Sequence, residues 1–226
     1  MLMLDGLRAD AVESGQMPNL VRLQKGEWHA GYGCAWTLSG FVNNGVKLEG
    51  SEKLPFENGV EFAATVWVRL PTTQTGDSVI FANKDWQNGN NPGIVLTSFR
   101  KRDGAIKPGV GFNAKIDGNP ARIDLGTYHF EPGKWEFYAV TRDNERTLSF
   151  YQGSSDGRLY RICGRAEKLV LRALPFCLGQ DGTGNYDHLL DGEIDDFALW
   201  TRALDSCEIK RIYEAGRKGL ELAVIL

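Results

Sequence analysis

The sequence predicts an all-β protein built as one antiparallel β-sandwich, with a short C-terminal helix and an N-terminal extension of one strand and one helix. Two observations support this fold class. From residue 41 onward, short runs of alternating apolar and polar residues are separated by turn residues roughly every ten positions, as in antiparallel sheets. Helix signals occur only near the two ends of the chain. With 226 residues, the chain is long enough to enclose one large core.

The individual strands follow from the period-two alternation of side chains. The pair at 135–141 and 147–152 is predicted to form a hairpin, because the polar residues at 143–145 between them favour a turn. The other strands are predicted at 42–48, 62–70, 78–83, 93–99 and 109–115 and, from shorter patterns, at 159–162, 168–171 and 175–178.

The segment at 191–216, DGEIDDFALWTRALDSCEIKRIYEAG, predicts a strand followed by a capped helix. Asp205 is the expected N-cap, and Glu208 stands three residues later, which makes a capping box. Gly216 stands where a glycine commonly ends a helix. In the strand, Asp195 and Asp196 are expected to face opposite sides of the sheet, so that one of them needs a buried partner. A cation near the turn at 49–51 and a bond to loop amides are both open as that partner.

This segment carries a family resemblance. The pattern G-x-I-D-D-F-A-L-W-x-R-A-L-x-x-x-E-I-x-x-I-Y resembles the closing strand and helix of laminin-G-like, concanavalin A-like jelly-roll domains, a superfamily that includes the pentraxins. As an order of strands, the resemblance extends over about residues 42–216. It implies a jelly-roll sandwich that acts as a noncatalytic binding module for a carbohydrate or an extracellular protein ligand. It also implies an extracellular or periplasmic location.

Residues 1–40 have a different pattern and are predicted to be an extension of the sandwich domain at 41–226. The run LMLDGLRADAVESGQMPNLVRLQKGE resembles the opening strand and helix of the alkaline-phosphatase superfamily, in particular type I phosphodiesterases and sulfatases. That resemblance implies a metal ligand at Asp5 and a nucleophile at Thr37 or Ser39. A two-metal site needs several more Asp and His ligands, and the chain has only three histidines. We therefore expect a phosphatase-like remnant without an active site of its own, or an extension with an accidental match.

Two loops rich in Asn, Asp and Gly are candidate calcium sites. The loops at 83–93 and 179–187 place carboxylate and amide oxygens in turning backbone, which is the ligand type that calcium prefers. The run L-G-Q-D at 178–181 also resembles a calcium loop of the pentraxins. Ordinary turn chemistry explains the same residues, and both interpretations stay open. The candidate metal ligands are Asp85, Asn88, Asn91, Gln180 and Asp181.

The same loops supply candidate carbohydrate-binding residues. Aromatic rings stack on the apolar faces of sugars, while amides bond the hydroxyls, which selects Trp86, Asn90 and Tyr186. The tryptophans within strand patterns are predicted to belong to the core. They are Trp67, Trp135 and Trp200.

Composition excludes several classes of partner. With 26 basic and 29 acidic residues and a net charge of −3, nucleic acid is an unsuitable ligand. No apolar segment is long enough for a membrane span. For the four cysteines, a Cys163–Cys177 bridge across a hairpin and buried free thiols both stay open.

Two hypotheses about function follow. The first is a noncatalytic binding module, associated with a secreted hydrolase and with calcium as a candidate cofactor. The second is a fragment of a phosphodiesterase- or sulfatase-type metal-dependent hydrolase. A domain that only packs against a parent enzyme is a third interpretation. The sandwich shows no complete set of nucleophile, base and orienting residue, so we expect no catalysis from the chain alone.

Overall fold

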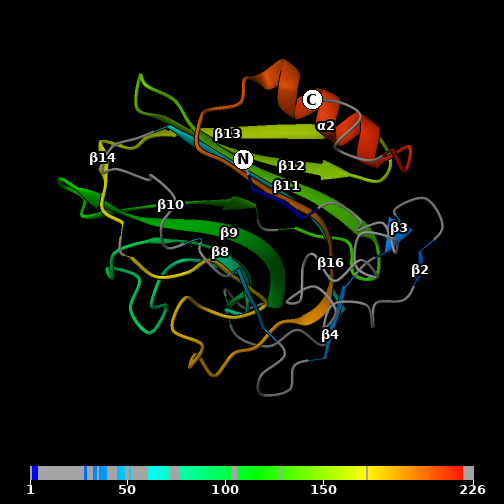
Figure 1. Ribbon diagram of the computed structural model, residues 1–226, viewed down its shortest axis with the longest axis horizontal. Helices are drawn as coiled ribbons and strands as arrows, with labels where there is room; N and C mark the ends of the chain where they lie inside the picture. Colours follow the sequence, from blue (N-terminus) through cyan, green and yellow to red (C-terminus); the bar gives the residue numbers. More distant parts are fainter. Residues whose placement is uncertain are drawn as a thin grey trace, which may run out of the picture.

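Two antiparallel sheets, stacked face to face, form the sandwich in the computed structural model (Figure 1). The structure describes residues 2–4, 28–29, 33–34, 36–39, 45–48, 51, 61–71, 77–102, 106–127, 129–171 and 173–220. The all-β prediction is confirmed, and the described helix α2 (Ser206–Gly216) lies near the C-terminus as expected. No helix among the described residues is long and apolar enough to cross a membrane.

The first sheet has the strand order β1-β16-β6-β11-β12-β13, with β4 also paired to β16. Its strands are β1 (Leu2–Leu4), β4 (Trp36–Ser39), β6 (Phe62–Arg69), β11 (Trp135–Arg142), β12 (Thr147–Ser154), β13 (Leu159–Arg165) and β16 (Asp191–Trp200).

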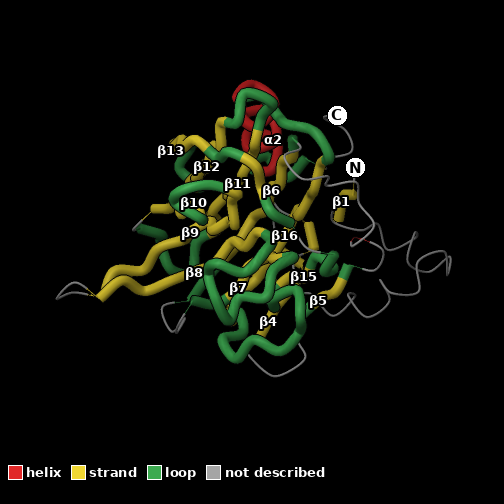
Figure 2. The backbone as a smooth tube through the Cα atoms, turned by 90° about the vertical axis from the view of Figure 1, so that its left-hand side faces the viewer, coloured by secondary structure: helices red, strands yellow, loops and turns green. Residues whose placement is uncertain are grey.

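The second sheet has the order β10-β9-β8-β7-β15-β5, with β14 paired to β9 (Figure 2). Its strands are β5 (Val46–Lys47), β7 (Val79–Ala82), β8 (Ile94–Arg102), β9 (Ile106–Asp117), β10 (Arg122–Thr127), β14 (Lys168–Leu169) and β15 (Cys177–Leu178). A separate two-stranded sheet joins β2 (Trp28–His29) to β3 (Gly33–Cys34).

The central strands of the first sheet, such as β6 and β11, are buried on both faces. Along β6, Phe62, Ala64 and Val66 belong to the core between the sheets, whereas Ala63 and Trp67 belong to a second cluster on the outer face. Helix α2 packs on that outer face, as Figure 1 shows. Because α2 covers the outer face of the first sheet, a polar site is expected on the outer face of the second sheet.

Helix α2 begins with the predicted capping box. The side chain of Asp205 accepts hydrogen bonds from the backbone N–H groups of Cys207 (2.7 Å) and Glu208 (2.8 Å), and Glu208 accepts one from the N–H of Asp205 (2.9 Å). The predicted helix end is different, because Gly216 is still helical and the left-handed glycine is Gly219, with φ 64°.

Gly216 instead serves close packing. A Cβ atom there would lie 2.2 Å from Nε1 of Trp67, so only glycine lets the helix approach the sheet this closely. The indole of Trp67 also stacks on Tyr213, with the ring centroids 5.8 Å apart. The glycine is therefore selected by a contact with the sheet.

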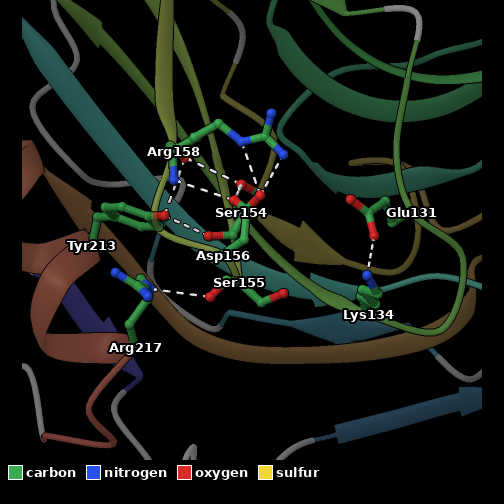
Figure 3. A network of polar contacts seen from close by, with 8 residues as sticks. All are labelled: Glu131, Lys134, Ser154, Ser155, Asp156, Arg158, Tyr213 and Arg217. Atoms are coloured by element: carbon green, nitrogen blue, oxygen red, sulfur yellow. Dashed lines mark hydrogen bonds and ion pairs between the residues drawn. The ribbon is translucent and has the colours of Figure 1, made fainter.

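The turn between β12 and β13 holds the last turns of α2 (Figure 3). The hydroxyl of Tyr213 donates to the backbone carbonyls of Ser154 and Arg158, and Nε of Arg217 donates to that of Ser155. Hydrogen bonds to backbone carbonyls thus join the helix to a hairpin far away in the sequence.

The closing strand β16 departs from the expected alternation. Its pairing with β6 shifts register between Asp195 and Ala198, and Asp196 has a φ of 47°. Both acidic residues are buried, at 5% and 8% exposure, whereas the alternation predicted one. The extra residue of a β-bulge explains the difference. The N–H of Asp196 donates to Oδ1 of Asp195 (2.9 Å), which agrees with the interpretation that an acid bonds a nearby amide.

The hairpin expected to carry a Cys163–Cys177 bridge is absent. Cys163 lies on β13 in the first sheet, and Cys177 lies on β15 in the second. Cys163 is a free, exposed thiol that lies 3.6 Å from Oγ of Ser149.

Parts of the N-terminal segment pair with the sandwich. Strands β1 and β4 both lie antiparallel to β16. Thr37 and Ser39 lie in β4, whereas Asp5 and the helix expected from residue 18 lie outside the described residues. The boundary between 1–40 and 41–226 stays a prediction.

The cap of α2 gives a first testable prediction. Asp205→Ala removes the acceptor for two N–H groups of the first turn, so the free energy of unfolding should fall by about 1 kcal/mol. Urea unfolding at neutral pH measures the change. Ser206→Ala, one residue further on, is the matched control, and equal losses in both variants would contradict the role of the cap.

Candidate ligand-binding groove

A groove with a volume of about 630 Å³ lies on the outer face of the second sheet. Its floor is formed by β8, β9 and β10. Two of its walls come from the loops that follow β7 and β15, which are adjacent strands. These are the two polar loops singled out in the sequence, at 83–93 and 179–187.

The centre of the floor is glycine backbone with the ring of Phe99 lying over it. Thr97, Gly111 and Gly126 lie directly opposite one another on β8, β9 and β10. A Cβ atom on Gly111 would lie 2.9 Å from the ring of Phe99, and one on Gly126 would lie 2.7 Å from the carbonyl oxygen of Val110. The two glycines therefore leave room for the Phe99 ring and for the close approach of β9 and β10.

Trp86 and Tyr186 form an aromatic wall. Both rings are half-buried and pack against the outward side chains of Val79, Ala82 and Val95. Each residue comes from a different loop, and both line the groove. The structure thus brings together two of the three candidate carbohydrate-binding residues.

The third, Asn90, does not line the groove. It is exposed, and its backbone N–H donates to Oδ1 of Asn88 (2.9 Å) within the loop. The prediction that it binds a sugar therefore has no geometric support.

Tyr186 is held in its neutral form. Burial, together with the nearby acids Asp77, Asp181 and Asp187, raises the pKa of its hydroxyl to about 12. The hydroxyl therefore keeps its proton at neutral pH and can donate a hydrogen bond.

Asp181 joins the two loops. Its Oδ2 accepts a hydrogen bond from the N–H of Trp86 (3.0 Å). Its Oδ1 accepts from the N–H (3.0 Å) and hydroxyl (2.7 Å) of Thr183 and from the N–H of Gly184 (2.9 Å). The residue is fully buried, so these donors replace water around the carboxylate. Asp181 therefore positions Trp86 in the wall.

A ring of polar contacts fastens the loop at 83–93 to the sheet. The buried ammonium of Lys84 donates to the carbonyl of Gly89 (2.9 Å) and to Oδ1 of Asn113 on β9 (2.7 Å). Nδ2 of Asn113 donates to Oδ1 of Asp124 on β10 (2.7 Å). Oδ2 of Asp124 lies 2.9 Å from Nε of Arg122, whose guanidinium packs back against Gly89.

Burial governs the charge of Lys84. Removal from water lowers the pKa of its ammonium to about 8, against an opposing pull from Asp124. At neutral pH the ammonium stays charged, which strengthens its two hydrogen bonds. The side chain lies under the loop and does not line the groove.

Acidic residues and a histidine complete the lining beside Tyr186. Asp77, Asp187 and His188 line this part, and the His188 ring meets Tyr186 edge-on at 5.4 Å between centroids. Burial raises the pKa of Asp77, and the nearby His188 opposes this shift.

The remaining candidate metal ligands are engaged in bonds within their loops. Oδ1 of Asp85 accepts from the N–H of Gln87 (3.1 Å), and Nδ2 of Asn91 donates to the carbonyl of Asp85 (3.1 Å). The amide of Gln180 bonds the N–H of Asp181 and the carbonyl of Tyr186. Across the described residues, no group of three His, Cys, Asp or Glu side chains is arranged to hold a metal ion. Calcium binding stays a prediction.

Sequence reasoning missed part of this site. Strand β10, which carries Arg122 and Asp124, was not predicted, although R-I-D-L at 122–125 alternates with period two. From the sequence, Lys84 is expected in a loop and Asn113 in a strand, and neither is expected to have a functional role. No local sequence pattern could have predicted the hydrogen bond between Lys84 and Asn113, because 29 residues separate them.

The ammonium of Lys84 gives a second prediction. It is harder to protonate in the native state than in the unfolded chain, whose pKa is near 10.5. Between pH 8 and 10.5 the unfolded state therefore binds more protons, so native stability rises with pH. Relative to Lys84→Met, the wild type should gain stability across this window in urea unfolding. If the free energy of unfolding of the two proteins changed with pH in parallel, the lowered pKa of Lys84 would be contradicted.

Thermal unfolding in excess EDTA and then in millimolar calcium tests the calcium prediction. A cation that binds only the native state raises the unfolding midpoint, and Asp85→Ala should abolish that rise. Asp85 is the informative position, because Asp181→Ala would also remove the hydrogen bond from Trp86 that joins the two loops. An unfolding midpoint that is the same at every calcium concentration would rule out the predicted calcium site.

Comparisons with known proteins bear on the fold. No curated protein matches the chain. The botulinum neurotoxin serotype G binding domain aligns with a TM-score of 0.57 at 14% identity, over 80% of this chain and 42% of that one. The serotype D binding domain aligns with a TM-score of 0.55 at 19% identity, over 84% and 45%. The chain thus spans less than half the length of these domains.

A carbohydrate-binding module has a similar fold. The CBM40 of the IT-sialidase from Ruminococcus gnavus aligns with a TM-score of 0.57 at 13% identity, over 79% of this chain and 96% of that one. At such identities, the likeness shows the fold. A family model matches residues 40–210, which is more than half of the chain. The protein therefore belongs to the concanavalin A-like lectin/glucanases superfamily.

Proposed function

We propose that the protein is a noncatalytic carbohydrate-binding module that holds a sugar in the groove on its second sheet. The observation that carries this proposal is the placement of Trp86 and Tyr186 beside the strand floor, next to the polar side chains of Arg122 and Asp124. A pyranose has apolar faces and a hydroxylated rim, and this groove offers a partner for each.

The wall and the floor favour a flat, hydroxyl-rich ligand. A ring stacked on Trp86 buries apolar area, and such aromatic contacts contribute about 0.5–1.5 kcal/mol beyond the area term. The exposed carboxylate of Asp124 can accept hydrogen bonds from hydroxyls at the floor. Because Lys84 and Asp181 hold the loops, little ordering remains to be done when the ligand binds.

The relatives in fold support the ligand class. The Ruminococcus gnavus CBM40 is described in complex with α2,3-sialyllactose, and it belongs to a sialidase. By analogy, we propose that this chain also serves a secreted hydrolase and acts in an extracellular or periplasmic setting. Calcium dependence is part of the same proposal, and the calcium titration above tests it.

No observation on the described residues favours the alternative of a metal-dependent hydrolase. That alternative depends on Asp5, which lies outside the described residues, and on Thr37 and Ser39 in β4. It stays a prediction from the sequence.

Removal of the aromatic wall tests the proposal. Trp86→Ala and Tyr186→Ala should each weaken binding to a glycan found on an array by about tenfold or more, because the stacked ring is lost. Isothermal titration calorimetry measures the affinity. Tyr160→Ala is the matched control, since this aromatic residue is 52% exposed on β13 and does not line the groove. Unchanged affinity in the folded Trp86 and Tyr186 variants would refute the assignment.

A further inference from the structure

We infer that the groove selects neutral glycans over sugars that carry a carboxylate, and that Asp124 is the residue that determines this selectivity. The inference rests on the proposed function and adds the charge class of the ligand. It follows from the acidic lining of the groove and from the contacts that already engage Arg122 and Lys84.

The ionisable lining of the groove is mainly acidic. Asp77, Asp124 and Asp187 line it, and Arg122 and His188 are the basic residues among its described lining. The three acidic side chains outnumber the single permanent cation, Arg122. A concave surface focuses the field of its charges, so a ligand carboxylate would be repelled on entry.

Arg122, the permanent cation of the lining, is already engaged. Its Nε lies 2.9 Å from Oδ2 of Asp124, with 45% and 56% of the two side chains exposed. The other edge of the guanidinium packs against the loop, since a Cβ on Gly89 would lie 2.4 Å from one of its terminal nitrogens. A ligand carboxylate needs the donor fork of an arginine, and here Asp124 competes for it.

Lys84 offers no substitute cation. Its side chain is fully buried, and its ammonium donates to the carbonyl of Gly89 and to Oδ1 of Asn113. To reach a ligand, it would have to leave both partners and displace the loop. The charges of Arg122 and Lys84 are therefore both engaged within the protein.

The remaining polar groups suit hydroxyls. The exposed part of the Asp124 carboxylate is a strong acceptor for O–H donors. Thr97, on β8, also lines the floor of the groove. An ionised carboxylate of the ligand offers no hydrogen for Asp124 to accept, whereas a hydroxyl in the same position offers one. The hydrogen-bonding groups and the electrostatic field therefore favour the same ligand class.

A glycan array of matched pairs tests the selectivity. Each pair holds a neutral oligosaccharide and the same oligosaccharide with one sialic or uronic acid, such as lactose and 3′-sialyllactose. We expect the wild type to bind neutral members about tenfold or more tightly than their acidic partners. A preference for acidic members would overturn the inference and leave the carbohydrate function intact. Binding to no member would overturn the proposed function itself.

Variants then test the role of Asp124. Asp124→Asn keeps an acceptor for Asn113 and releases Arg122, so affinity for the acidic members should rise about tenfold. The gain should vanish when Arg122→Ala is added. Asp187→Asn removes the same charge from the groove without freeing the arginine, and it should change acidic-sugar binding by less than about threefold. A folded Asp124→Asn protein that gains no affinity, or an equal gain in Asp187→Asn, would refute the assignment.

Discussion

The buried carboxylate of Asp181 is the interaction on which the candidate site depends. A carboxylate removed from water must receive hydrogen bonds, and its donors come from its own loop and from the N–H of Trp86 in the other loop. The two loops follow β7 and β15, which are neighbours in the second sheet. One charged group therefore couples the loop ends of adjacent strands and places the aromatic wall beside the floor.

The division of labour between the two sheets follows from burial. The outer face of the first sheet carries Trp67 and Phe137, and α2 covers this apolar surface. The outer face of the second sheet carries Arg122 and Asp124, whose side chains are 45% and 56% exposed, and such groups favour contact with water. Within the described part of the chain, no helix covers the outer face of the second sheet, so ligand binding is expected there.

Charge compensation links the stability of the groove to its selectivity. The contacts from Lys84 through Asn113 and Asp124 to Arg122 hold the loop on the sheet, and the same contacts occupy the cations near the floor. In the two loops that resemble a calcium site in the sequence, Asp85, Gln180 and Asp181 each use a side-chain oxygen to accept a hydrogen bond from a backbone N–H of their own loop. Turning loops rich in Asp and Asn support both uses, so residue type alone could not separate them.

The sequence by itself determined the all-β class, the capping box of α2 and the two loops that line the groove, because these features depend on residues close together in the chain. It did not reveal β10, the end of α2 or the role of Asp181. The N–H of Trp86 and its acceptor on Asp181 are 95 residues apart, and Gly216 is required by its contact with Trp67. Only the order of strands in the second sheet brings Lys84, Asn113 and Asp124 together. Contacts between distant residues are set by packing, which local patterns do not encode.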